Sequence, residues 1–366
     1  MRAALWMAVG LLAAGALGCS AKKLEAPDAG QPEKKKTEKK VDPYAELSFR
    51  ELGRHDKGAT HVAWSPDGKL LLSTGRDHKI YLWDPASGER VRTLEGHSDT
   101  VAMAVFSKDG AKIASAADDR TARIWEAASG KQLALLEEKA PKGKLSEEEQ
   151  AALDALPPPK VNWALFTADG AKLLTASDDF ALKLWDADSG KLLDKYVDEG
   201  CRQRSVHRRR EADGWVSSAG CVADGVAYLK FWDAAGHVTG VRGDERHDAH
   251  FIAFDRQARF LAAADGSTFV NIFSAQGSFL KQIMVGSYHF CLEFGPADAT
   301  LLVGTDGGQV LVYRVDGWRR LGQVDVGQAV AIDGLALNPN TGSLAAALRD
   351  GRVMLLDEPI RPPAAD

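Results

Sequence analysis

The sequence predicts an all-β fold assembled from one strand unit that recurs along the chain. Its clearest copy is residues 96–126, GHSDTVAMAVFSKDGAKIASAADDRTARIWE, which contain three apolar runs that each end at a turn. Alternation of apolar and polar residues within the runs is typical of β-strands, and Asp109-Gly110 between the first two runs is a strong hairpin signal. Related units recur with a period of about 40 residues, and this self-similarity indicates a repeat architecture.

The end of the third run marks each repeat. Successive marker positions are 42, 60, 47, 41, 40 and 43 residues apart, and the first four repeats end in LWD, IWE, LWD and FWD. The hairpins upstream of these tails read SPDG, SKDG, TADG and EADG. The seven marker residues are Trp83, Trp125, Trp185, Trp232, Phe273, Tyr313 and Leu356.

These motifs resemble those of the WD40 repeat proteins over residues 45–357, strongly in the first three repeats and in degenerate form in the last four. Repeats of about 40 residues with four strands each imply a β-propeller. The last repeat stops soon after Leu356, where two prolines disfavour a fourth strand. Residues 47–55 align with residues 89–97 at a constant offset of 42, so they supply the missing strand.

We therefore predict an all-β, seven-bladed WD40-type β-propeller over residues 44–360, in which an N-terminal strand closes the last blade. Closure of this kind is how the resembled family completes its ring, and it hides sheet edges that would otherwise template aggregation. Residues 361–366 are expected to be a C-terminal tail.

In WD40 proteins, a His, a Ser or Thr, an Asp and a Trp form a buried hydrogen-bond chain within a blade. A Ser–His–Asp set also suits a hydrolase, but recurrence at the repeat period, with Trp as a fourth member, favours a structural role. Blades four to seven lack the chain and are expected to rely on apolar packing. The resemblance assigns the chain to His55, Ser73, Asp77 and Trp83, to His97, Ser115, Asp119 and Trp125, and, without the His, to Thr175, Asp179 and Trp185.

Residues 1–18 carry one Arg and then a short apolar run of the secretory signal type. The run ends at Ala16-Leu17-Gly18-Cys19, which resembles the bacterial lipobox, although Ala16 stands where Leu is commonest. The resemblance implies that Cys19 is lipidated; an ordinary signal peptide and an uncleaved anchor are the alternatives. Residues 19–43 are rich in Lys, Glu and Pro, so we predict an unfolded tether. By the sorting rule of bacterial lipoproteins, Ser20 favours the periplasmic face of the outer membrane.

Two cysteines fall in the fourth repeat. Cys201 lies near its His position, and Cys221 aligns two residues past its Ser or Thr position. In an oxidising periplasm a disulfide would join them, and two buried free thiols are the alternative. Cys291, on the first strand of blade six, is expected to be a small core residue.

The spacing of 60 residues reveals an insertion at residues 138–160, before blade three. Ser146 and Glu149 form a capping box that predicts a short helix, with Leu153 and Leu156 on one side. In the WD40 fold this loop lies on the top face, where family members commonly bind partners; a decorative insertion is the alternative. Phe180 either anchors an interface or folds onto the helix. The other top-face candidates are Arg76, His78, Asp118, Arg120 and Asp178.

The run CRQRSVHRRRE at residues 201–211 places several cations along the predicted inner strand of blade four. They either receive an anionic ligand or a partner's carboxylates, or pair with acids on neighbouring blades. The candidate anion site consists of Arg202, Arg204, Arg208 and Arg210.

The net charge of −5 gives no strong case for nucleic acid or anionic membrane as a partner. No nucleotide-binding loop, nucleophile elbow or metal-ligand spacing is present, so no cofactor, metal or catalytic residue is predicted. The leading hypothesis is a non-enzymatic scaffold, lipid-anchored at the bacterial cell envelope, that binds a protein partner whose identity the sequence does not give. The rival is a propeller enzyme or small-molecule binder that uses the channel mouth near the Arg-rich strand.

Overall fold

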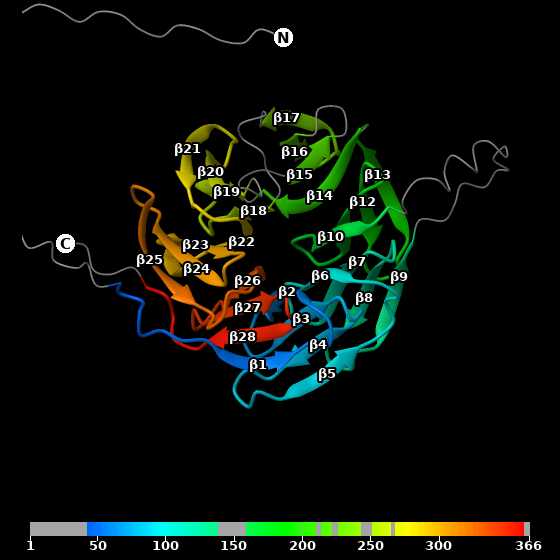
Figure 1. Ribbon diagram of the computed structural model, residues 1–366. Helices are drawn as coiled ribbons and strands as arrows, with labels where there is room; N and C mark the ends of the chain where they lie inside the picture. Colours follow the sequence, from blue (N-terminus) through cyan, green and yellow to red (C-terminus); the bar gives the residue numbers. More distant parts are fainter. Residues whose placement is uncertain are drawn as a thin grey trace, which may run out of the picture. The chain divides into compact units, whose positions relative to one another are not determined.

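The computed structural model describes residues 42–137, 159–198, 200–209, 214–221, 226–242, 251–264 and 268–361. In this part of the chain, seven four-stranded antiparallel sheets surround a common centre (Figure 1). One 3₁₀ helix, η1 (Pro296–Asp298), accompanies the strands. The predicted all-β, seven-bladed propeller is confirmed. No helix among the described residues is long and apolar enough to cross a membrane.

Several predictions from the sequence concern residues outside the described ranges. They are the signal peptide, Cys19, nearly all of the tether, residues 138–158 of the insertion with Leu153 and Leu156, Arg210, and residues 362–366 of the C-terminal tail. The described chain begins at Asp42, and Tyr44 is already buried beside blades six and seven.

The first blade contains β2 (Ala59–Trp64), β3 (Leu71–Gly75), β4 (Ile80–Trp83) and β5 (Arg90–Leu94). The second contains β6 (Val101–Phe106), β7 (Lys112–Ala117), β8 (Ala122–Glu126) and β9 (Gln132–Leu136). The third contains β10 (Val161–Phe166), β11 (Lys172–Ser177), β12 (Ala181–Asp186) and β13 (Leu192–Val197). The fourth contains β14 (Cys201–Arg208), β15 (Gly214–Cys221), β16 (Ala227–Asp233) and β17 (Val238–Arg242).

The fifth blade contains β18 (Phe251–Phe254), β19 (Phe260–Ala264), β20 (Phe269–Ser274) and β21 (Phe279–Met284). The sixth contains β22 (His289–Phe294), β23 (Thr300–Thr305), β24 (Gln309–Arg314) and β25 (Arg319–Asp325). The seventh contains β26 (Ile332–Leu337), β27 (Leu344–Leu348), β28 (Arg352–Leu356) and, from the start of the domain, β1 (Arg50–Arg54).

The ring closes by two kinds of contact. The innermost strands β2, β6, β10, β14, β18, β22 and β26 each contact the next, and β26 contacts β2 again. The seventh sheet is completed by β1, which pairs antiparallel with β28 from Arg50 opposite Leu355 to Arg54 opposite Arg352. The predicted N-terminal closing strand is therefore confirmed, and blade seven joins the two ends of the domain.

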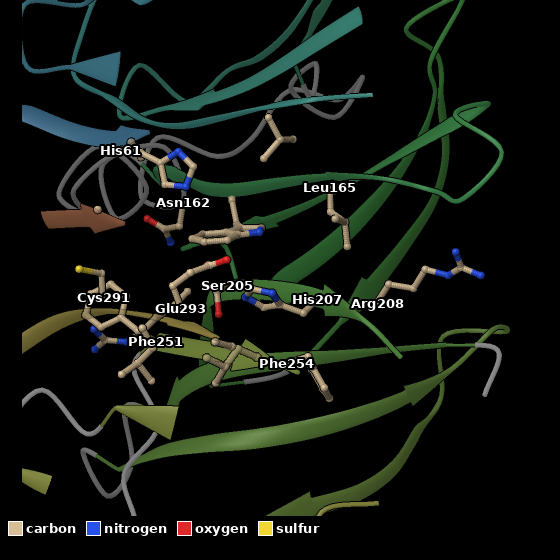
Figure 2. Close-up of a pocket in the computed structure, with 18 of the residues that line it drawn as sticks. His61, Asn162, Leu165, Ser205, His207, Arg208, Phe251, Phe254, Cys291 and Glu293 are labelled. Atoms are coloured by element: carbon tan, nitrogen blue, oxygen red, sulfur yellow. The ribbon is translucent and has the colours of Figure 1, made fainter. Parts of the chain in front are cut away.

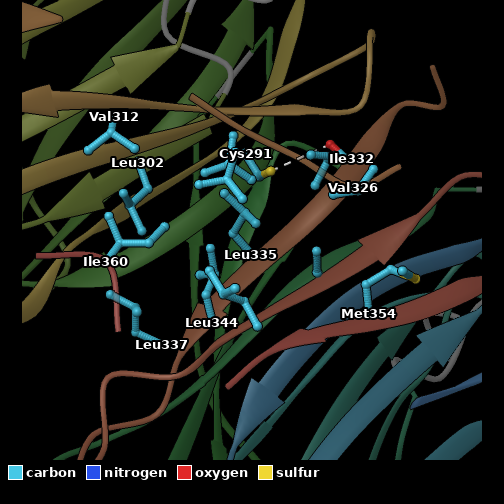
Figure 3. Packing of buried hydrophobic residues seen from close by; sticks show 14 of the residues in the cluster. Cys291, Leu302, Val312, Val326, Ile332, Leu335, Leu337, Leu344, Met354 and Ile360 are labelled. Atoms are coloured by element: carbon cyan, nitrogen blue, oxygen red, sulfur yellow. Dashed lines mark hydrogen bonds between the residues drawn. The ribbon is translucent and has the colours of Figure 1, made fainter. Parts of the chain in front are cut away.

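Apolar side chains fill the spaces between blades. Between blades six and seven, Leu302, Leu335, Leu344 and Met354 belong to one buried cluster (Figure 3). Cys291 lies in the same cluster, and its thiol donates to the backbone oxygen of Ile332 (3.4 Å). Cys291 is thus a buried free cysteine in the core, as predicted.

The hydrogen-bond chains assigned to blades one and two are present. In blade one, Trp83 Nε1 donates to Ser73 Oγ (2.8 Å), and His55 bonds Ser73 Oγ through Nε2 (2.8 Å) and Asp77 Oδ1 through Nδ1 (2.8 Å). Since the Ser73 hydroxyl has one proton, it donates to Nε2, and the Nδ1 proton goes to Asp77. All of these polar groups are thereby satisfied away from water.

Blade two repeats this arrangement. Trp125 Nε1 donates to Ser115 Oγ (2.9 Å), and His97 bonds Ser115 Oγ (2.8 Å) and Asp119 Oδ2 (2.8 Å). Burial favours a higher pKa for the Asp119 carboxyl, but hydrogen bonds from His97 and Thr121 outweigh it and leave that pKa well below its ordinary value. Asp119 therefore remains ionised and fixes the loop that carries His97.

Blade three agrees with the expectation of a chain without the His, whereas blade four differs from the expectation. In blade three, which lacks the His, Trp185 Nε1 donates to Thr175 Oγ1 (2.9 Å) and Lys183 pairs with Asp179. Blade four was expected to rely on apolar packing, and this is wrong: Trp232 Nε1 donates to Ser217 Oγ (2.8 Å). Each of these two blades also has a buried lysine on its third strand that pairs with a carboxylate, and in blade four Lys230 Nζ lies 2.6 Å from Asp198 Oδ1.

The same register corrects the position of Cys221. Ser217 is opposite Lys230, as Ser73 is opposite Tyr81, so Ser217 occupies the Ser position and Cys221 lies four residues past it rather than two. Cys201 and Cys221 face each other across β14 and β15 and form a disulfide.

Reducing this disulfide is expected to lower the free energy of unfolding by about 3 kcal/mol, because the bond closes a loop of 20 residues in the unfolded chain. Denaturant unfolding with and without a reductant measures the effect. The matched control is the double variant Cys201→Ser, Cys221→Ser, which should not respond to reductant. An equal response in that variant would show that the reductant does not act through the Cys201–Cys221 disulfide.

Candidate functional site

A cavity of about 1180 Å³ runs through the centre of the ring, lined by residues from the innermost strands of all seven blades. Asp178, in the turn between β11 and β12, lies at one end. Lys108 and Thr167, which follow β6 and β10, lie at the other. Its volume lies slightly above the usual range of small-ligand pockets, which is about 300–1,000 Å³. We call this cavity the channel.

Most innermost strands carry a β-bulge near their first residues. The register shifts at the same place in β2, β6, β10, β14, β22 and β26. A bulge adds one residue to a strand and re-aims its side chain. The extra residues that line the channel are Thr60, Ala102, Asn162, Arg204 and Asp333.

Three of these bulge residues are bonded to a neighbouring blade. Thr60 Oγ1 donates to the oxygen of Val101 (2.6 Å), and Asn162 Nδ2 donates to the oxygen of Gln203 (2.9 Å). Asp333 accepts from Arg76 Nη2 of blade one (3.3 Å). Arg204 is different, because no hydrogen bond or ion pair involves its side chain within the described ranges.

The predicted anion site therefore has a defined location. Arg202, Arg204 and Arg208 are exposed and line the channel from β14. Within the described part of the chain, none of the three has an ion pair. This does not agree with the alternative that they pair with acids of neighbouring blades. Figure 2 shows Arg208 directed away from Ser205 and His207, so it lies apart from the other polar groups.

An aromatic wall crosses one side of the channel. The ring centres of His61 and Trp163 are 6.0 Å apart, those of Trp163 and His207 are 5.0 Å apart, and those of His207 and Phe254 are 6.5 Å apart. Burial lowers the pKa of both His61 and His207 to about 4, so both imidazoles are neutral at pH 7. Three buried polar atoms in the channel have no hydrogen-bond partner among the described residues: His61 Nδ1, Ser205 Oγ and His207 Nε2.

Glu293 faces these groups from blade six. Figure 2 shows its side chain directed toward Ser205 and His207. Burial raises the pKa of the Glu293 carboxyl to about 7, although the charge of Arg256 acts in the opposite direction. At neutral pH this carboxyl is therefore about half protonated and able to donate as well as accept a hydrogen bond.

The raised pKa gives a testable pH dependence. Unfolded Glu293 ionises near pH 4.5, whereas the folded protein retains the proton until about pH 7, so this group costs stability as pH rises through that window. Glu293→Gln removes the titration and should stabilise the protein at pH 8 by at most about 3 kcal/mol, with no effect at pH 4. Denaturant unfolding at both pH values tests this, and an identical difference at both would contradict it.

The top-face candidates lie in the turns between second and third strands. Arg76 bonds Asp333, Asp118 pairs with Lys160, and Asp178 accepts from Asn162 Nδ2 (2.8 Å), so these three join structural contacts around the channel mouth. The structure places His78, Arg120 and Phe180 in the left-handed conformation, with φ of 68°, 71° and 64°. Arg120 is exposed, whereas His78 and Phe180 are half-buried.

Sequence reasoning missed His61, Trp163, Ser205 and Glu293. A signal was present, because polar residues interrupt strands that are otherwise apolar, but their convergence required the ring. Among the described residues, no group of three or more His, Cys, Asp or Glu side chains is placed to hold a metal ion.

Comparison with known families adds the repeat type. The profile described as "WD domain, G-beta repeat" matches residues 48–84, 88–126 and 158–186. These three stretches of the propeller match the WD40 repeat. The first match combines β1 of blade seven with β2, β3 and β4 of blade one, so the sequence repeat is offset from the blade by one strand. WD40 repeats generally mediate protein–protein interactions or scaffolding.

Curated relatives are similar over short segments. "Probable serine/threonine-protein kinase PkwA" of Thermomonospora curvata is 44% identical over 59 residues, 16% of this chain and 8% of that protein. "Protein hir-1" of Neurospora crassa is 40% identical over 50 residues, 14% of this chain and 5% of that protein. "COMPASS component SWD1" of Saccharomyces cerevisiae is 58% identical over 33 residues, 9% of this chain and 8% of that protein. The chain thus spans less than a tenth of each of these relatives.

Proposed function

We propose that this WD40 propeller is a non-enzymatic module that binds a protein partner at the bacterial cell envelope, where a lipid on Cys19 anchors it. Support for a binding role comes from the face on which the innermost strands begin, here called the upper face. By the antiparallel order of the sheets, it carries the loops into the innermost strands and the turns between second and third strands.

Large apolar side chains are exposed on the upper face, and this observation carries the proposal. Met284 at the end of β21 is 70% exposed, and Tyr288, in the loop before β22, is 56% exposed. The backbone of this loop is held, because the amide of Asp306 donates to the oxygen of Tyr288 (3.0 Å). An exposed aromatic on a fixed loop is well suited to anchor an interface.

The chemistry of the described residues favours binding over catalysis. Ser73 and Ser115, in the two His-containing chains, are fully buried, which keeps a substrate away from them. In the channel, neither Ser205 Oγ nor His207 Nε2 has a hydrogen-bond partner, so they do not form the nucleophile–base pair that covalent catalysis uses. The rival function, a small-molecule binder or propeller enzyme, would use this channel.

Photo-crosslinking in the native envelope tests the binding role. A photoreactive residue at position 288 is expected to capture one protein, and Met284→Asp should reduce its yield by about tenfold or more. The matched control is Val91→Asp, since Val91 is a 44% exposed residue on the outer strand β5. No captured protein, or an equal loss in the control, would contradict the proposed interface.

Lipid anchoring has a separate test. Metabolic labelling with a fatty acid should mark the full chain, and Cys19→Ala should abolish the label and release the protein from the membrane fraction, because acyl chains supply the membrane affinity. Ser20→Ala, next to the modified residue, is the matched control and should keep the label. An unlabelled wild-type chain would refute the anchor.

A further inference from the structure

The charges that line the channel are unbalanced. The whole chain is acidic, with a net charge of −5. The acids at the upper end of the channel, however, are already paired and do not neutralise its cations. Asp178 accepts from Asn162, and Asp333 accepts from Arg349 Nη2 (2.8 Å) in addition to Arg76. Arg202 and Arg204 have no such partner within the described ranges. The upper channel therefore presents two uncompensated cations to a ligand.

These two cations are held on a rigid support. Arg202 directly follows the disulfide-bonded Cys201 and lies opposite Gly220. Arg204 occupies the bulge of β14 and lies across Gly220, where an added Cβ would be 2.7 Å from Arg204 Nε. Because residue 220 is glycine, the Arg204 side chain has room to lie across it, and the disulfide holds the backbone of the two strands beside it before any ligand arrives.

A neutral donor lies next along the same strand. Ser205 is 2% exposed, it lines the channel, and its buried Oγ has no hydrogen-bond partner. A buried hydroxyl without a partner costs free energy that a ligand oxygen would recover. Its proton can be donated to an anion beside the two guanidinium groups.

We propose that the upper channel binds a carboxylate group, held by Arg202 and Arg204 and by a hydrogen bond from Ser205. Glu293 favours a carboxylate over a phosphate, because it faces the same space and, half protonated at neutral pH, shares a proton with a monoanion more readily than it tolerates a dianion. The carboxylate comes either from a free organic acid or from an acidic segment of a protein. Binding of an acidic protein segment rests on the proposed function, in which this chain binds a protein partner.

Isothermal titration of the purified full chain in detergent tests the site, with the monoanion propionate, inorganic phosphate and a C-terminally amidated hexaglutamate peptide as probes. Arg204→Gln and Arg202→Gln should each weaken binding of the carboxylate probes by about tenfold or more. Gly220→Ala keeps the charge but displaces the Arg204 side chain, and it should also weaken binding. Arg208→Gln is the matched control, since Arg208 points away, and it should change affinity less than about twofold.

Binding of propionate alone supports a free-acid site, and binding of hexaglutamate supports a site for an acidic protein segment. Tighter binding of phosphate than of both carboxylate probes, or an equal loss in Arg208→Gln, would overturn the proposal. Unfolding midpoints of all variants, measured in parallel, must match the wild type for a loss of binding to count. If the crosslinked partner at position 288 is captured by Arg204→Gln as by the wild type while no probe binds, the carboxylate site fails and the proposed function stands.

Discussion

Deleting residues 47–55 is expected to unfold the propeller. The variant should show no cooperative transition at the denaturant concentration where the wild type unfolds. The deletion removes β1 and leaves β28 without its partner strand. It also removes Leu52, which is buried against Trp83 and Val353, and burial of such a side chain contributes about 1.5–3 kcal/mol. Ser73 and Asp77 lose their bonds to His55, at about 1–3 kcal/mol for each unsatisfied group. Together these losses are on the order of the whole stability of a typical domain.

Urea unfolding followed by Trp fluorescence, together with size-exclusion chromatography, measures this effect. The exposed edge of β28 should also promote aggregation. Deleting residues 28–36 removes the same length of chain before β1 and is the matched control, which should unfold like the wild type. If the variant that lacks residues 47–55 unfolds at the wild-type midpoint, β1 does not hold the ring closed.

Ser115→Ala is expected to destabilise the protein about twice as much as Thr175→Ala. Ser115 bonds both Trp125 Nε1 and His97 Nε2, whereas the hydroxyl of Thr175 accepts from Trp185 Nε1 in a blade without the His. Because each buried polar group left unsatisfied costs about 1–3 kcal/mol, the expected losses are about 3 kcal/mol and about 1.5 kcal/mol.

Denaturant unfolding of both variants provides the comparison. Ser129→Ala is the control, because Ser129 is exposed in the turn after β8, and its effect should remain within about 0.5 kcal/mol. Equal losses in Ser115→Ala and Thr175→Ala would mean that the bond to His97 adds nothing to stability. The same pair of variants therefore separates the contribution of the His from that of the Trp.

In blade four, aligning the sequence with the other repeats predicted the structure only in part. The pairing of Cys201 with Cys221 was one of two interpretations, and the offset of Cys221 was wrong by two residues because β14 and β15 are eight residues long, longer than the equivalent strands of blades one to three. The buried pair Lys230–Asp198 went unnoticed, since a lysine in an apolar run gives no local sign of its partner.

The sequence by itself determined the number of blades, their order and the strand that closes the ring. Strand alternation, turn residues and the Trp markers are local or periodic features, and repeats that each need a neighbour to bury their apolar faces permit few arrangements. The tertiary structure alone decided the content of the channel. His61, Ser205 and Glu293 lie on blades one, four and six, and only closure of the ring brings them to one cavity. Their altered pKa values and unmade hydrogen bonds follow from burial there, which no stretch of sequence records.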